Sequence, residues 1–267
     1  MTTLPPGCEP TDEFRTDVLE LGDDLFPALF ESARLEAVGN GRWGAVLVKP
    51  DTDGRIPLVR TTTCYRHPAQ RFGPLHEHLA QQARAQASRS LAFNNALFEY
   101  YTNAYTKMGA HSDQALDLDE ASTIAIFSCY KLPTGARPPR KLLIEAKDAG
   151  GRELAIPLAN HGVVSFSLAT NRRFRHRIVL DPLAKDPENP WLGITFRVSK
   201  TFVERRGEHL YFSGGAPLTL ADEAQRTQFY QLRRRENTEV DFTYPSIPYT
   251  ISESDLLPVG AAATPRE

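Results

Sequence analysis

Short apolar and alternating segments dominate the middle of this chain of 267 residues. They are rich in β-branched and aromatic residues, and turn-forming residues separate them; they cover 93–101, 122–130, 158–168, 171–180 and 191–199. Segments of this length and composition are typical of β-strands. The pattern predicts a mainly β domain with flanking helices, whose barrel strands occupy about residues 93–212.

The segments on either side of this region have a different composition. In an N-terminal extension, 1–92, the pattern predicts a helix near 24–35, strands at 42–48 and near 58–64, and a helix over 74–89. A further helix is predicted over about 220–235, because its first turn is acidic and its last turn is basic, which suits the helix dipole. We expect one domain over 1–250 and a flexible tail over 251–267.

Composition narrows the possible classes of protein. Basic and acidic residues are nearly balanced, 31 against 33, and the sequence pI is about 6.4, whereas a protein that binds duplex nucleic acid normally carries a basic face. No apolar run approaches twenty residues and the N-terminus lacks a signal pattern, so no membrane contact is expected. Cys8, Cys64 and Cys129 are widely spaced, which favours a reducing, cytoplasmic location. No feature sets an oligomeric state.

One group of residues carries the chemistry that the sequence predicts. His111-Ser112-Asp113 places an imidazole and a carboxylate close together, and His176 can return to the same point if the intervening chain doubles back as a sheet. Two histidines and one carboxylate on one face of a metal leave the opposite face open, as in non-heme Fe(II) oxygenases. On the tripeptide alone, a solvent-exposed turn is equally consistent.

Other polar groups have simpler interpretations. His76-Glu77-His78 lies in a helical stretch and is read as a surface helix, and His161 as a turn residue. The run Arg172–Arg177 could bind an anionic substrate or form a solvated outer face, since on a strand Arg175 and His176 point to opposite faces. The arginines at 233–235 are read as a helix end.

Over its central part the sequence resembles the AlkB-like family of Fe(II)/2-oxoglutarate dioxygenases. The similarity covers about residues 55–205, and its matching segments are Phe93-Asn94 through Leu97 and Tyr101 to His111-Ser112-Asp113, then His161-Gly162-Val163-Val164, Arg173-Phe174-Arg175-His176 and Ile194-Thr195-Phe196-Arg197. The order and spacing of these segments make the resemblance more specific than any one of them.

The resemblance implies a double-stranded β-helix, which is a jelly-roll barrel, with iron near one mouth. It implies that His111, Asp113 and His176 are the iron ligands and that Tyr101 and Arg197 bind 2-oxoglutarate. Arginine suits the last role because its planar guanidinium pairs with a carboxylate through two hydrogen bonds.

Two positions depart from the family pattern. Glu99 stands where the family has asparagine, and Trp191 stands where it has a second arginine, so the second carboxylate of 2-oxoglutarate lacks its expected partner. In another register, Arg197-Val198-Ser199 would supply the missing unit, which makes Ser199 a further candidate for binding the co-substrate. The candidates for the substrate pocket are Glu99, Tyr105, Trp191 and Arg175.

The resulting hypothesis is an Fe(II)/2-oxoglutarate-dependent dioxygenase that uses dioxygen to oxidise a C–H bond of a small molecule, by hydroxylation or a related oxidation, in a biosynthetic pathway. The charge balance favours a small molecule over nucleic acid. Two alternatives stay open: an AlkB-type oxidative demethylase of nucleic acid, and a jelly-roll binding module without catalysis.

Overall fold

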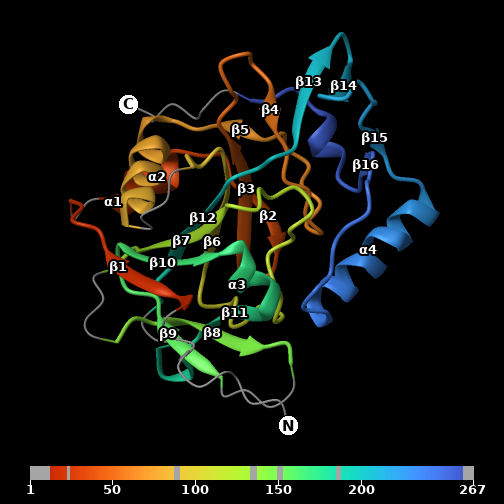
Figure 1. Ribbon diagram of the computed structural model, residues 1–267. Helices are drawn as coiled ribbons and strands as arrows, with labels where there is room; N and C mark the ends of the chain where they lie inside the picture. The colour runs from red at the N-terminus through yellow and green to blue at the C-terminus, as the bar shows by residue number, and fades with distance from the viewer. Residues whose placement is uncertain are drawn as a thin grey trace.

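Two sheets form the centre of the protein, and all of their strand pairs are antiparallel except β3 with β5 (Figure 1). The computed structural model describes residues 13–22, 25–86, 91–132, 137–148, 153–184 and 188–260. In the larger sheet the strand order is β1 (Arg15–Val18), β10 (Gly162–Ser167), β7 (Thr123–Tyr130), β12 (Trp191–Arg197), β6 (Asn95–Tyr101), β3 (Arg42–Val48) and β2 (Glu36–Gly39), with the short β5 (Gln70–Arg71) beside β3.

The smaller sheet faces this one. Its strand order is β11 (Phe174–Leu180), β8 (Arg140–Ala146) and β9 (Leu154–Pro157). Two isolated bridges, Lys107 to Val179 and His111 to His176, add the segment after β6 to its other edge. From β6 to β12 the chain therefore passes repeatedly between the two sheets, which is the strand order of a double-stranded β-helix. The predicted mainly β, jelly-roll fold is confirmed.

Alternation along the strands builds two apolar layers. Phe98, Leu192 and Ile194 point outward from the larger sheet and pack against α1 (Leu25–Glu31) and α2 (Pro74–Gln86). Side chains at the alternate positions, including Ile126 and Ile144, fill the space between the sheets. Because residues i and i+2 share a face of a strand, the interior of the barrel can be read directly from the register.

The remaining elements lie around the barrel. They are β4 (Ile56–Pro57), β13 (Phe202–Arg206) and β14 (His209–Phe212), which form a third sheet, the parallel pair β15 (Thr219–Leu220) and β16 (Tyr249–Thr250), helices α3 (Leu168–Arg173) and α4 (Glu223–Thr238), and the short 3-10 helices η2 (Pro182–Ala184) and η3 (Glu253–Leu256). No helix in the described part of the chain combines the length and the hydrophobicity needed to span a lipid bilayer.

Several boundaries differ from the prediction. The barrel strands end at Arg197, and the last part of the predicted range 93–212 belongs to the third sheet instead. No strand forms over 58–64, and the short β4 ends just before this range. The tail expected to be flexible from residue 251 is packed as far as 260, where Gly260 pairs with Gln70, because Ile251 is buried in a cluster with α4. Residues 261–267 lie outside the described part.

His76 is not on the surface as expected. His76 lies in the first turn of α2 and its side chain is fully buried on the inner side of this helix, where the Gly73 backbone N–H donates to Nδ1 at 3.0 Å and Ser32 Oγ lies 2.8 Å from Nε2. An accepting Nδ1 carries no proton, so Nε2–H donates to Ser32, which in turn donates to the Leu29 carbonyl at 2.6 Å. Protonation would break this chain, and burial lowers the pKa of His76 to about 4.

This histidine should make the fold sensitive to mild acid. The unfolded chain takes up a proton near the ordinary histidine pKa of 6.5, whereas folded His76 resists it until about pH 4. The contribution of neutral His76 to the free energy of unfolding is therefore fully present above pH 6.5. It is lost as the pH falls toward 4, by up to about 3 kcal/mol. We expect urea unfolding at pH 7 and pH 5 to show a smaller loss in His76→Asn than in the unchanged protein; equal losses would contradict the assignment.

Candidate metal centre

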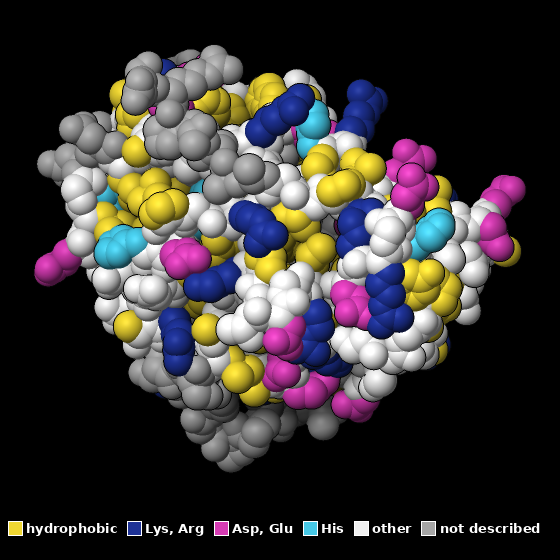
Figure 2. Space-filling view, turned by 90° about the horizontal axis from the view of Figure 1, so that it is seen from above, with side chains coloured by type: hydrophobic (Ala, Val, Ile, Leu, Met, Phe, Trp, Pro, Cys, Tyr) yellow, Lys and Arg dark blue, Asp and Glu magenta, His cyan; other side chains and the backbone are white. Residues whose placement is uncertain are grey.

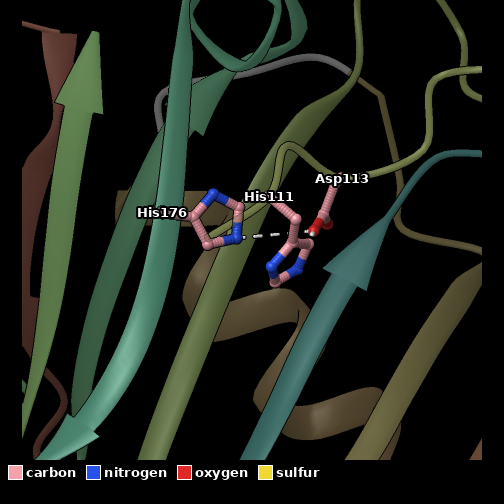
Figure 3. A group of neighbouring side chains, drawn as sticks. All are labelled: His111, Asp113 and His176. Atoms are coloured by element: carbon pink, nitrogen blue, oxygen red, sulfur yellow. Dashed lines mark ion pairs between the residues drawn. The ribbon is translucent and has the colours of Figure 1, made fainter. Parts of the chain in front are cut away.

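The two candidate histidines are brought together by backbone pairing. His111 N–H donates to the His176 carbonyl at 3.0 Å, and His176 N–H donates to the His111 carbonyl at 2.7 Å. Directly opposed residues in an antiparallel pair place their side chains on the same face. The two imidazole rings are accordingly 4.7 Å apart, and Asp113 approaches them from the following loop (Figure 3).

The donor atoms of the three side chains converge on one point. Oδ1 of Asp113 lies 3.5 Å from His176 Nε2 and 3.9 Å from His111 Nε2, and the three ligand atoms lie within 4.8 Å of one another. Ligands bound about 2.1 Å from one metal stand roughly 3 Å apart in an octahedral arrangement, so a small contraction suffices. The convergence that we predicted from the spacing is present.

Hydrogen bonding prepares His111 as a ligand. Its Nδ1 lies 3.0 Å from the Gly109 carbonyl, which can only accept, so Nδ1 carries the proton and Nε2 presents a lone pair toward Asp113. Burial, together with the neighbouring His176 and Arg233, lowers the pKa of His111. The neutral form, which is the form that binds a metal, is therefore favoured.

Arg197 neutralises the carboxylate of the site. It points into the barrel, and its Nε donates to Asp113 Oδ2 at 2.7 Å. Burial alone would raise the pKa of Asp113, but Arg197 and His176 hold it well below its usual range. Asp113 is thus a charged carboxylate with one oxygen bound to Arg197 and the other directed at the histidines. The anion that Arg197 contacts in this structure is Asp113.

Two elements distant in sequence fix the loop that carries the ligands. Asn171 of α3 accepts a hydrogen bond from the Asp113 backbone N–H through Oδ1, at 2.7 Å, and donates one to the Asp113 carbonyl through Nδ2, at 2.8 Å. On α4, Asn237 Oδ1 accepts from the Ser112 N–H at 3.0 Å, Glu236 accepts from the Ala115 N–H at 2.7 Å, and Arg233 donates to the Ser112 carbonyl. Arg233 is buried beside this loop, so its interpretation as a helix end was wrong.

The predicted pocket residues on β6 and β12 lie together inside the barrel. The Tyr101 ring is 4.6 Å from that of Tyr105 and 4.8 Å from that of Trp191. Glu99 accepts from Arg42 Nε at 2.9 Å and from its Nη2 at 2.6 Å. Sequence reasoning missed Arg42, which lies on β3 directly across from Tyr101.

Trp191 occupies its position only because a glycine stands two residues further on. A Cβ atom at Gly193 would lie 1.9 Å from the Trp191 ring, which covers this glycine. The indole therefore fills space that a larger side chain at 193 would occupy. The position of the Trp191 ring thus depends on the glycine at 193.

Two other predicted residues are directed elsewhere. Arg175 alternates with His176 and points to the outer face of β11, where its Nη2 lies 3.1 Å from Glu145. The Ser199 hydroxyl donates to the Leu58 carbonyl at 2.6 Å. The structure therefore brings neither residue to the histidine pair.

The donor set suits a divalent transition metal. Two imidazoles and one carboxylate on one side leave the remaining positions of an octahedral ion open. The side chains of Asp113 and His176 are almost completely buried, whereas that of His111 is 30% exposed, so the site is open to solvent on that side.

Comparisons with known proteins give only distant structural matches. No protein-family model matches the chain, and no curated protein is significantly similar to it. Among solved structures, a prolyl-4-hydroxylase from Pseudomonas putida is 14% identical over 70% of this chain and 92% of its own, with a TM-score of 0.39. OsALKBH1 is 14% identical over 73% and 100%, with a TM-score of 0.43. A 2OG-Fe(II) oxygenase family oxidoreductase from Burkholderia pseudomallei is 12% identical over 69% and 88%, with a TM-score of 0.43. The fold assignment rests on the strand order.

The contact from α4 should tune metal affinity. Asn237→Ala removes the acceptor for the Ser112 N–H and loosens the loop between two ligands, so we expect affinity for Co(II) to fall by about 10-fold, as for other residues that orient ligands. Competition with a chromogenic chelator measures it. Arg234→Ala, an exposed neighbour on the same helix, is the control and should leave the affinity unchanged. Equal affinities in both variants would show that α4 does not position the site.

Proposed function

We propose that this protein is an Fe(II)- and 2-oxoglutarate-dependent dioxygenase that oxidises a C–H bond of a small molecule. The convergence of His111, Asp113 and His176 at one mouth of a jelly-roll barrel carries the proposal. A cytoplasmic location, inferred from the cysteine spacing, stays a prediction.

The residues of the site have distinct tasks in this proposal. His111, His176 and Asp113 would hold the iron, and Arg197 keeps Asp113 charged. When bound, iron and 2-oxoglutarate supply the oxidising chemistry, with dioxygen as oxidant and succinate and carbon dioxide as products of the co-substrate. The aromatic side chains around Tyr101 exclude water from the inner end of the site and orient what enters it.

The charge distribution supports a small molecule as substrate. The arginines of the run 172–177, which could have formed a basic patch, each pair with a glutamate: Arg172 with Glu120, Arg173 with Glu13, Arg175 with Glu145, and Arg177 with Glu145 and Glu153. On the face shown in Figure 2, basic side chains are interspersed with acidic ones. Nucleic acid instead favours a continuous basic surface.

The reaction class is tested by binding. We expect anaerobic addition of Fe(II) and 2-oxoglutarate to produce the weak visible charge-transfer band of the iron chelate. Asp113→Asn should weaken Fe(II) binding by more than about 100-fold, beyond the loss caused by removing a residue that merely orients a ligand, and should abolish turnover. The amide oxygen can still accept from Arg197, so the variant should remain folded.

A thermal melt of Asp113→Asn provides the control for folding. A folded variant with normal iron binding would remove Asp113 from the ligand set. An unchanged protein that binds iron but develops no band with 2-oxoglutarate would favour the non-catalytic binding module.

The substrate class is tested separately with oligonucleotides. We expect no shift of single- or double-stranded oligonucleotides in a gel at low salt, because the acidic partners neutralise the arginine run. A shift that weakens steeply with added salt would favour the nucleic-acid demethylase over the small-molecule enzyme.

A further inference from the structure

One buried arginine stands apart from the others. Four arginines are buried in the described part of the chain: Arg60, Arg140, Arg197 and Arg233. Three of them pair with a buried carboxylate: Arg60 with Asp117, Arg197 with Asp113, and Arg233 with Glu236. Arg140 has no exposed surface, and no carboxylate of the described residues lies within ion-pair distance of it. A buried charge without a counter-charge is costly unless something else binds it.

The guanidinium of Arg140 is held in place but only partly used. Its Nη1 donates to the Tyr105 carbonyl at 2.9 Å and its Nη2 to the Thr102 carbonyl at 2.8 Å. Nε is buried and has no partner. A guanidinium has five N–H groups, so the edge that includes Nε is available for a two-point contact with a carboxylate.

Further unpartnered donors lie around the same space. The Tyr101 hydroxyl, the Trp191 indole N–H and the Ser128 hydroxyl are buried and lack partners. The Arg140 guanidinium lies 5.2 Å from the centre of the Tyr101 ring, which contacts Trp191, and Ser128 is directly across from Gly193 on the same face of the sheet. Since buried donors are rarely left unsatisfied, this set indicates an acceptor with several oxygens.

The other cations near the barrel already have partners. Arg42 is bound to Glu99, and although burial opposes it, Glu99 raises the pKa of Arg42. Burial lowers the pKa of Arg140, as is expected of a cation without a counter-charge. Arg197 is bound to Asp113.

We infer that Arg140 binds the distal carboxylate of 2-oxoglutarate, with Tyr101 and Trp191 as additional donors. The inference rests on the proposed function. Along β8, Arg140 is four residues from Ile144, which pairs with His176, a separation of about 13 Å at 3.3 Å per residue. The arginine side chain and a five-carbon dicarboxylate, bound to the metal by its other end, together span this distance. The cation that the family pattern places on β12 thus comes from β8.

A pair of ligands isolates this contact. In 2-oxopentanoate a methyl group replaces the distal carboxylate, while the end that binds the metal is unchanged. For Fe(II)-loaded protein without oxygen, titration of the chelate band gives the affinity for each ligand. Arg140→Gln should weaken 2-oxoglutarate binding by about 100-fold or more, as when one partner of a buried charge pair is removed, and should leave 2-oxopentanoate binding nearly unchanged. Arg140→Lys should show an intermediate loss of affinity for 2-oxoglutarate, because an ammonium group keeps the charge but cannot donate two parallel hydrogen bonds to a carboxylate as a guanidinium does.

Lys141→Gln is the matched control. It removes one positive charge from the neighbouring position of β8, where the side chain points away from the barrel and pairs with Asp181 at 2.7 Å, and it should not change either affinity. Thermal melts establish whether the variants are folded. If Arg140→Gln does not fold, Arg140→Lys alone tests the role of Arg140 in 2-oxoglutarate binding.

The outcomes separate this inference from the proposed function. If the unchanged protein binds 2-oxoglutarate and both Arg140 variants keep its preference over 2-oxopentanoate, the role of Arg140 is overturned and the enzyme class stands. If the preference is instead lost when Arg42→Gln and Glu99→Gln are combined, Arg42 is the anchor. Iron binding without any 2-oxoglutarate binding would overturn both proposals.

Discussion

Two backbone hydrogen bonds between His111 and His176 hold the candidate site together. They join the segment after β6 to the edge of the smaller sheet, and in doing so they place both imidazoles on the inner face of the barrel. Asp113 lies two residues after His111, so its approach to His176 also depends on this pairing. A slip of one residue in its register would turn His176 outward and Arg175 inward, and would remove one ligand from the site.

Burial makes the choice of charges inside the barrel strict. Asp113 is acceptable between the sheets because Arg197 reaches it from β12, and Glu99 because Arg42 reaches it from β3. Each pair joins elements far apart in the sequence, so the pairs also select the correct packing of those elements. Breaking one member leaves a buried charge without a partner, which costs more than the pair contributes.

Local patterns predicted the strands and the residues that converge at the candidate site, and contacts between distant segments account for what the patterns missed. Alternation identifies β6, β7, β11 and β12, and the face of His176 follows from it. The hydrogen bonds from α4 to Ser112 join residues more than 120 positions apart, and nothing in the local sequence distinguishes Arg233 from an exposed arginine. His76 was misread because its partner, Ser32, is 44 residues away. Arg140, by contrast, shares the alternation of Leu142 and Ile144, and could have been placed inside the barrel from the sequence.

The packing of Trp191 over Gly193 sets which groups face the interior of the barrel on β12. An arginine at 191 would lie on the same inner face as Arg197, whereas the indole packs over Gly193 and against Tyr101. Trp191 therefore presents an N–H donor on this face but no positive charge. Arg140 contacts Tyr101 from the opposite sheet, so positive charge is still available to the same space. Because the two sheets face each other, a charge required at one depth of the barrel can be supplied from either sheet, without any change at His111, Asp113 or His176.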